Sequence, residues 1–142
     1  MTANVVTALS SIQGLLAEKA AWGGTEWTVM GLGTAAATTA TLAGNTNNAG
    51  VKVQHLLDHL TLSVSGAITV ASTVQVKDGT TVIWECQWGI GAPLVLDFDF
   101  LLRPLPTTPG ALLSASTSGT QGAALVCEIS MTGRDCVPNS PA

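Results

Sequence analysis

Charged and aromatic residues are both scarce in this chain, and each shortage argues against a class of function. Charged residues make up 10% of the 142 residues, against about 25% in an ordinary soluble domain. Only five are Lys or Arg and the formal net charge is −4, which argues against nucleic-acid binding because phosphates need basic partners. The chain has four Trp, two Phe and no Tyr, so a sugar cleft lined with aromatic rings is not expected.

Cysteine is also rare, with only Cys86, Cys127 and Cys136 in the sequence. Three cysteines do not make a disulfide framework, and the odd number favours synthesis in a reducing compartment. Cys86 and Cys127 fall on the inward faces of predicted strands, so we expect buried thiols there. A bridge between these two remains possible if their strands are neighbours. Cys136 is expected in a loose C-terminal tail.

Long apolar runs are absent, so we expect neither a transmembrane helix nor a membrane partner. The N-terminus also lacks the basic region of a secretory signal. Residues 5 to 20 instead show apolar positions at helical spacing, followed by Gly23 and Gly24. This spacing predicts one short amphipathic helix or arm. Its apolar positions are Val5, Leu9, Ile12, Leu16 and Ala20.

The stretch TVQVKDGTTVIWECQW, residues 73 to 88, predicts a β-hairpin. A three-residue turn at residues 77 to 79 pairs Val74 with Val82 and places Gly79 in the left-handed conformation. A shorter turn at residues 78 and 79 would send Trp84 to the polar side, so the three-residue turn is preferred. The predicted inward face consists of Val70, Val74, Val76, Val82, Trp84, Cys86 and Trp88.

Further segments alternate between apolar and polar residues in the way of half-buried strands. HLTLSVSGAITV, residues 59 to 70, predicts a second hairpin that turns at residues 65 to 67, and PLVLDFDFLL, residues 93 to 102, places Leu94, Leu96, Phe98, Phe100 and Leu102 on one side. ALVCEISM places Leu125, Cys127, Ile129 and Met131 on one side, while TEWTVMGL, TAAATTATL and GALLSAST are weaker strand candidates.

Together these segments predict an all-β fold, an antiparallel β-sandwich or jelly roll of about seven to eight strands. The sandwich should occupy residues 25 to 133 as a single domain. The helix or arm at residues 1 to 24 precedes it, and residues 134 to 142 follow as the tail.

Three groups of residues resemble chemical motifs, but each has a simpler explanation. GLGTAA, from Gly31 to Ala36, lacks the following helix that a dinucleotide fingerprint requires. His55 and His59 could share a metal, yet no third ligand is evident. Asp97 and Asp99 would lie about 6–7 Å apart on a strand, as in some glycosidases, but a solvated outer face explains them more simply. We therefore expect no catalytic residue, metal or cofactor, and no enzyme.

The outward faces of the predicted strands carry apolar residues that do not suit a solvated surface. Such residues in an obligate oligomer contact other subunits. The predicted contact residues in the sandwich are Leu57, Ile83, Val95 and Leu101.

Four segments follow one another within residues 49 to 135: AGVKVQHLLDHLTLSVSGA, TVQVKDGTTVIWECQW, FDFLLRPLPTTPGALLSAST and GAALVCEISMTGRD. In their order and spacing, these segments resemble the small β-sandwich decoration, or cement, proteins of tailed-bacteriophage capsids. The resemblance implies a jelly roll or related sandwich, commonly a homotrimer, bound in many copies to the outer capsid surface. It also implies that an N-terminal segment contacts the capsid or a neighbouring subunit, and it carries no catalytic residues.

The sequence thus predicts a non-enzymatic virion protein, made in the cytoplasm of the bacterial host, whose partners are the major capsid protein and further copies of itself. Val5, Leu9, Ile12 and Leu16 are the predicted capsid anchor. The alternative is a receptor- or carbohydrate-binding module of a phage tail, for which Trp22 and Trp27 are the candidate exposed aromatics.

Overall fold

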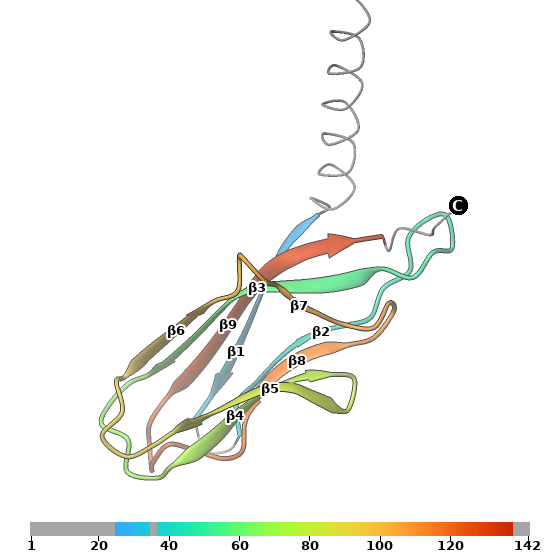
Figure 1. Cartoon of the computed structure of the whole chain (residues 1–142). Helices are drawn as coiled ribbons and strands as arrows, with labels where there is room; N and C mark the ends of the chain where they lie inside the picture. The colour runs from blue at the N-terminus through green and yellow to red at the C-terminus, as the bar shows by residue number, and fades with distance from the viewer. Residues whose placement is uncertain (1–24, 35–36, 138–142) are drawn as a thin grey trace, which may run out of the picture.

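Two antiparallel sheets face each other in the computed structural model, which describes residues 25–34 and 37–137 (Figure 1). One sheet has the order β1-β9-β3-β6, with β7 paired to β3, and the other has the order β2-β8-β4-β5. The strands are β1 (Glu26–Gly33), β2 (Thr39–Leu42), β3 (Gln54–Val64), β4 (Ser72–Asp78), β5 (Thr81–Trp88), β6 (Val95–Asp99), β7 (Leu105–Pro106), β8 (Leu113–Thr117) and β9 (Cys127–Cys136).

This arrangement confirms the predicted all-β sandwich, with nine strands in the described residues instead of seven or eight. Within those residues, no helix is long and apolar enough to cross a membrane. The predicted N-terminal helix or arm, with Val5, Leu9, Ile12 and Leu16, lies outside the described residues.

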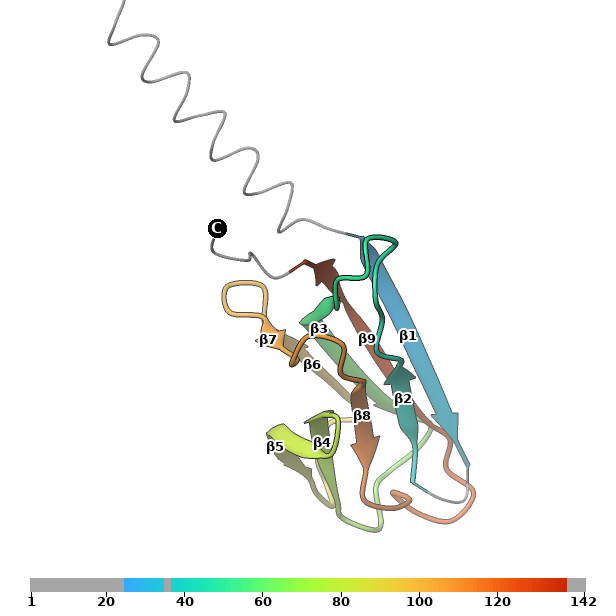
Figure 2. The same cartoon turned by 90° about the vertical axis from the view of Figure 1, so that its right-hand side faces the viewer.

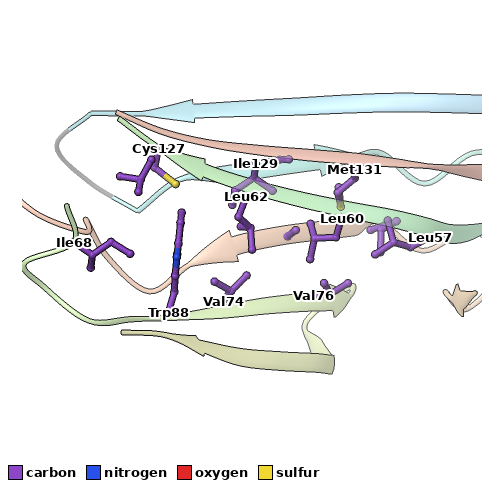
Figure 3. Packing of buried hydrophobic residues seen from close by; sticks show 14 residues of the cluster. Leu57, Leu60, Leu62, Ile68, Val74, Val76, Trp88, Cys127, Ile129 and Met131 are labelled. Carbon is purple, nitrogen blue, oxygen red and sulfur yellow. The ribbon is translucent and has the colours of Figure 1, made fainter. Parts of the chain in front are cut away.

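The core lies between the sheets and is built from the alternate residues that face inward (Figure 3). Leu60 and Leu62 of β3 lie on one side of it, and Val74 and Val76 of β4 lie on the other, all of them fully buried. Trp88 is fully buried as well. Cys127, Ile129 and Met131 point into the core as the alternation predicted, while Leu125, Leu96, Phe98 and Phe100 pack against it half-buried. Leu94 and Leu102 flank β6 and are exposed, contrary to the expectation for that segment.

Glycine in β1 allows β2 to pass close beneath it. A Cβ atom on Gly31 would lie 2.1 Å from the carbonyl oxygen of Thr39, and one on Gly33 would lie 2.2 Å from the hydroxyl of Thr38. Both distances are far below van der Waals contact. A Cβ atom on Gly31 would meet the backbone of β2, so this position requires glycine, whereas one on Gly33 would force the Thr38 side chain to move. The glycines of the GLGTAA stretch thus serve strand packing.

The hairpin between β4 and β5 forms, but its register differs from the prediction. Asp78 pairs with Thr81 and Val74 pairs with Cys86, so the turn consists of residues 79 and 80. Gly79 has a φ of +59°, the left-handed conformation that was expected. The carboxylate of Asp78 accepts hydrogen bonds of 2.9 and 2.7 Å from the backbone and hydroxyl of Thr108. This distant anchor extends β4 beyond the predicted turn.

Along most of the hairpin, the observed pairing is offset from the predicted pairing by an even number of residues. Most side chains therefore stay on the predicted face. Val74, Val76 and Trp88 are buried, and Trp84 and Cys86 are half-buried against the core. The prediction is wrong for Val82, 40% exposed beyond a bulge at Val76 and Lys77, and for Val70, 52% exposed before β4 begins.

The second predicted hairpin is wrong, because β3 and β4 belong to different sheets. At the end of the predicted first arm, the Val64 N–H donates to the Leu94 carbonyl, and the next residue, Ser65, donates its N–H to the Val126 carbonyl. Residues 65 to 71 therefore cross from one sheet to the other, and Ile68 within them is buried in the core.

A bulge in β3 overturns the prediction for Leu57. The pairing of β3 with β9 passes from Leu57 opposite Gly133 to His59 opposite Thr132, which leaves Asp58 as an extra residue. The bulge reverses the alternation, so Leu57 points inward and is fully buried. Ile83 is also corrected, since it is half-buried and packs against the core. Two predicted contact residues are exposed as expected, Val95 at 58% and Leu101 at 59%.

The C-terminal boundary also needs correction. Strand β9 continues to Cys136, so the tail does not begin at residue 134, and Cys136 is buried instead of lying in a tail. It pairs with Gln54 at the start of β3, and their side chains meet at 3.5 Å. Long pairing with β3 keeps this segment in the sheet. Residues 138 to 142 lie outside the described residues.

Candidate interaction surface

The two histidines of HLLDH lie on opposite faces of β3, because the bulge at Asp58 separates them. His55 is 1% exposed and faces inward, and the His59 side chain is 35% exposed on the outer face. They therefore do not share a metal. No group of three or more His, Cys, Asp or Glu side chains in the described ranges could hold one.

Both ring nitrogens of His55 are occupied by structural contacts. Nδ1 lies 2.5 Å from a carboxylate oxygen of Asp135, and Nε2 lies 2.9 Å from the Ala43 carbonyl oxygen. The edge of the ring meets Trp27 with 6.2 Å between centroids. Because an acceptor oxygen lies against each ring nitrogen, neither nitrogen is free to contact a nucleophile. The contacts of His55 instead fasten the connection between β2 and β3 to the end of β9.

The acid pair Asp97 and Asp99 does not form a paired catalytic site either. Asp97 bonds to the His59 ring and accepts a 3.0 Å hydrogen bond from the Thr61 hydroxyl. Asp99 caps the following turn by accepting a 2.8 Å hydrogen bond from the backbone of Leu101. Both carboxylates are exposed on the outer face of the sheet, so each has a local structural role in a solvated setting.

Two open hollows border this outer face, and Leu101 lines both of them. One has a volume of about 320 Å³ and includes Asp58, whose carboxylate is already held by Arg134 at 2.8 and 3.0 Å. The hydrogen bond to Asp58 raises the pKa of the Arg134 guanidinium, so the guanidinium stays charged. The second hollow, about 380 Å³, is lined mainly by Leu and Pro side chains.

The cysteines offer no activated nucleophile. All three are free thiols. Burial raises the pKa of Cys86, and it raises the pKa of Cys136 with a smaller contribution from the charge of Asp135. Burial likewise raises the pKa of Cys127, an effect that a hydrogen bond to Thr38 partly offsets. A thiol with a raised pKa holds less of the reactive thiolate at neutral pH.

The feature that stands out is one end of the sandwich, which we call the apolar end. It consists of three connections, residues 65–71, 89–94 and 118–126, gathered at the end of the sandwich opposite to the start of β1 (Figure 1). The large apolar side chains that these connections expose are Val70 at 52%, Ile90 at 71%, Leu94 at 42% and Val126 at 40%. Large apolar side chains exposed together at one end of a fold are typical of interaction sites.

Hydrogen bonds tie two of the three connections of the apolar end, residues 65–71 and 118–126, to each other. The Ser65 N–H donates to the Val126 carbonyl at 2.9 Å, and Ser65 accepts a hydrogen bond from the Val126 N–H through its hydroxyl. Gln121 is 2% exposed, and its carbonyl accepts hydrogen bonds from Thr69 and Val70. The apolar groups are thus presented on a fixed framework, and little conformational entropy is lost when a partner covers them.

Side chains from the core support the same framework. The indole N–H of Trp88 donates to the Pro93 carbonyl at 3.0 Å, which fixes the connection that carries Ile90. The side chain of Gln121 donates to the Ser72 hydroxyl at 3.1 Å and to the Gly119 carbonyl at 3.0 Å. Residues deep in the sandwich therefore determine where the exposed groups stand.

Charge is absent from the apolar end. The three connections contain no Asp, Glu, Lys, Arg or His. Charged residues at or next to strand ends on the opposite side of the sandwich include Glu26, Lys52, Asp99 and Arg103. A partner of this surface would meet it without having to desolvate charged groups, whose burial is costly.

Sequence reasoning missed this surface. Val70 and Leu94 were expected to face the core, and neither Ile90 nor Val126 was singled out. The signal in the sequence was the absence of charge from three separate connections, and the fold was needed to bring them together.

Comparison with models of known protein families finds none that matches this chain. A search of curated protein sequences likewise finds no match. Among solved structures, the chain is similar to one in the X-ray structure of tomato aspermy virus, with 9% sequence identity and a TM-score of 0.35, over 96% of this chain and 98% of that chain. A similarity at this TM-score carries no conclusion about function.

Proposed function

We propose that this chain is a non-enzymatic structural protein of a bacteriophage virion, which binds the outer surface of the capsid in many copies and stabilises it. The observation that supports this function is the apolar end, a rigid and uncharged surface on which Val70, Ile90, Leu94 and Val126 are exposed. The partner in this proposal is the major capsid protein, and the protein resides on the virion surface after synthesis in the host cytoplasm.

The chemistry of the apolar end suits such an attachment. Contacts between exposed charges are screened by salt and contribute little, whereas burial of apolar surface keeps its strength when the salt concentration changes. A shell under outward pressure from packaged DNA gains from many modest contacts repeated by symmetry. Engagement of several equivalent capsid positions by one oligomer would raise the overall affinity without any new contact.

Other predicted contacts belong to this proposal as well. Val5, Leu9, Ile12 and Leu16 stay predicted capsid contacts, and Val95 and Leu101 stay predicted subunit contacts. The homotrimer rests on the resemblance to decoration proteins. The tail-module alternative receives no support from Trp27, which is half-buried and packs against the core.

The first experiment is to count this chain in purified particles from its source by quantitative mass spectrometry against the major capsid protein. Hundreds of copies per particle are expected for a shell component. A handful of copies would place the protein at the tail or portal instead, and none at all would end the virion proposal.

A binding experiment then tests the apolar end itself, with shells that lack the protein and an Ile90→Asp variant. Burying one such side chain contributes about 1.5–3 kcal/mol, so we expect roughly 10- to 100-fold weaker binding. The matched control is Leu102→Asp, because Leu102 is 104% exposed in a turn outside the apolar end. Equal loss of binding in both variants would contradict attachment through the apolar end.

A further inference from the structure

Strand β1 leaves one backbone edge without a partner among the described residues. It runs for eight residues at the edge of its sheet and pairs with β9 alone, as Figure 2 shows from the side. In an antiparallel pair, about half of the backbone N–H and C=O groups of an edge strand point away from its partner. Those groups are available to a further strand.

Each of the other three sheet edges has a feature that discourages pairing. Strand β2 has only four residues. Strand β5 follows a bulged pairing and carries Glu85. Strand β6 has five residues, and two of them are Asp97 and Asp99. Short length, bulges and charges are the usual protections of an edge strand.

Strand β1 has none of these protections beyond its first residue. It contains no Pro, Lys or Arg, and its single charge is Glu26. Its outer face instead exposes Met30 at 57% and Leu32 at 65%. Long, apolar and open edges of this kind pair with other strands.

We propose that β1 pairs antiparallel with β1 of a second copy of this chain, across a two-fold axis, so that the two sheets become continuous. The charge pattern fits this partner, because antiparallel pairing places the two Glu26 carboxylates at opposite ends of the joined strands. It also brings Met30 and Leu32 of each copy onto one face, where they cover one another.

The size of the contact predicts a reversible dimer. A strand of eight residues is about 27 Å long, and stable permanent interfaces are generally larger than one such strand pair can supply. Dimerisation should therefore depend on protein concentration in the micromolar to millimolar range.

The test uses the full chain alone, without capsids, so its outcome is independent of capsid attachment, and it distinguishes this dimer from the homotrimer that the resemblance implies. Sedimentation velocity over that concentration range should show monomer and dimer in equilibrium. Met30→Lys places like charges on the same face of the joined strands and should weaken dimerisation by about tenfold or more. The control Leu102→Lys adds the same charge at a residue that is 104% exposed in a turn outside β1, and it should leave the equilibrium unchanged.

Amide hydrogen exchange identifies the strand involved. Protection of residues 26 to 33 should rise with protein concentration in the wild type and not in Met30→Lys. A monomer at every concentration, a trimeric mass, or an equilibrium disturbed by Leu102→Lys and not by Met30→Lys would each overturn the proposal. Protection of β1 that is independent of concentration would also overturn it, because the edge would then be covered within one chain.

Discussion

Replacing Leu57 with Ala tests the bulge that overturned the predicted outward position of this residue. Leu57 is fully buried in the core, and the residue opposite it on β9 is Gly133. Large-to-small changes at buried leucines cost about 2–5 kcal/mol. Gly133 has no side chain that could fill the space, so we expect a loss of about 3–5 kcal/mol.

Equilibrium unfolding in urea, followed by tryptophan fluorescence, measures this loss. Leu57→Met keeps the volume and should cost less than about 1.5 kcal/mol, which covers the case in which Leu57→Ala does not fold. The control Leu101→Ala changes a residue that is 59% exposed and should stay within about 0.5 kcal/mol. If Leu57→Ala also costs less than about 1 kcal/mol, Leu57 is not in the core and the bulge at Asp58 is wrong.

Three further predictions concern packing, the outer ion pair and the thiols. Gly31→Ala should destabilise the fold by about 1–3 kcal/mol in thermal melts, because its Cβ would meet the β2 backbone. The control is Gly89→Ala, whose Cβ meets no atom within 4 Å and which should be neutral or slightly stabilising. Asp58→Asn leaves the guanidinium of Arg134 without its carboxylate and should cost about 1–3 kcal/mol in the same assay, and an unchanged melting temperature would refute this. Cys127, 1% exposed with its pKa raised by burial, should react with a thiol reagent only after unfolding, and rapid reaction in the native state would contradict its position.

The alternation of apolar residues predicted the sandwich well where strands are regular. Cys127, Ile129 and Met131 of β9 all face the core as expected. Regular strands have a strict period of two, so the side chains themselves report the buried face. The same signal recovered β1 and β8, which were only weak candidates.

The errors arise where a contact between residues distant in sequence changes the register. Asp58 is bulged out of β3 and binds Arg134, 76 positions away. Asp78 is held in β4 by Thr108, 30 positions away. A single-sequence pattern contains neither partner, so it continued the alternation through Leu57 and placed the turn too early.

The candidate surface was harder to predict than the fold for a related reason. The alternation places Val95 and Leu101 on the outside of the sandwich, and both are exposed. The apolar end, however, is made by loop residues such as Ile90 and Val126, which obey no period. Their proximity follows from the crossing of residues 65 to 71 between the sheets, a connection that the sequence had predicted as a tight hairpin.

The two proposed contacts use different parts of the sandwich, and this separation makes them compatible. The apolar end is formed by loop tips, whereas the open edge of β1 runs along the side of its sheet (Figure 2). Because β1 pairs antiparallel with its copy, the two apolar ends of the dimer point in opposite directions, so one of them can attach to a capsid while the other faces away. Ile90→Asp should therefore weaken capsid binding without changing the dimer, and Met30→Lys should weaken the dimer while each copy keeps its own apolar end. If the two variants instead changed both properties together, one shared surface would be responsible and the separation would be wrong.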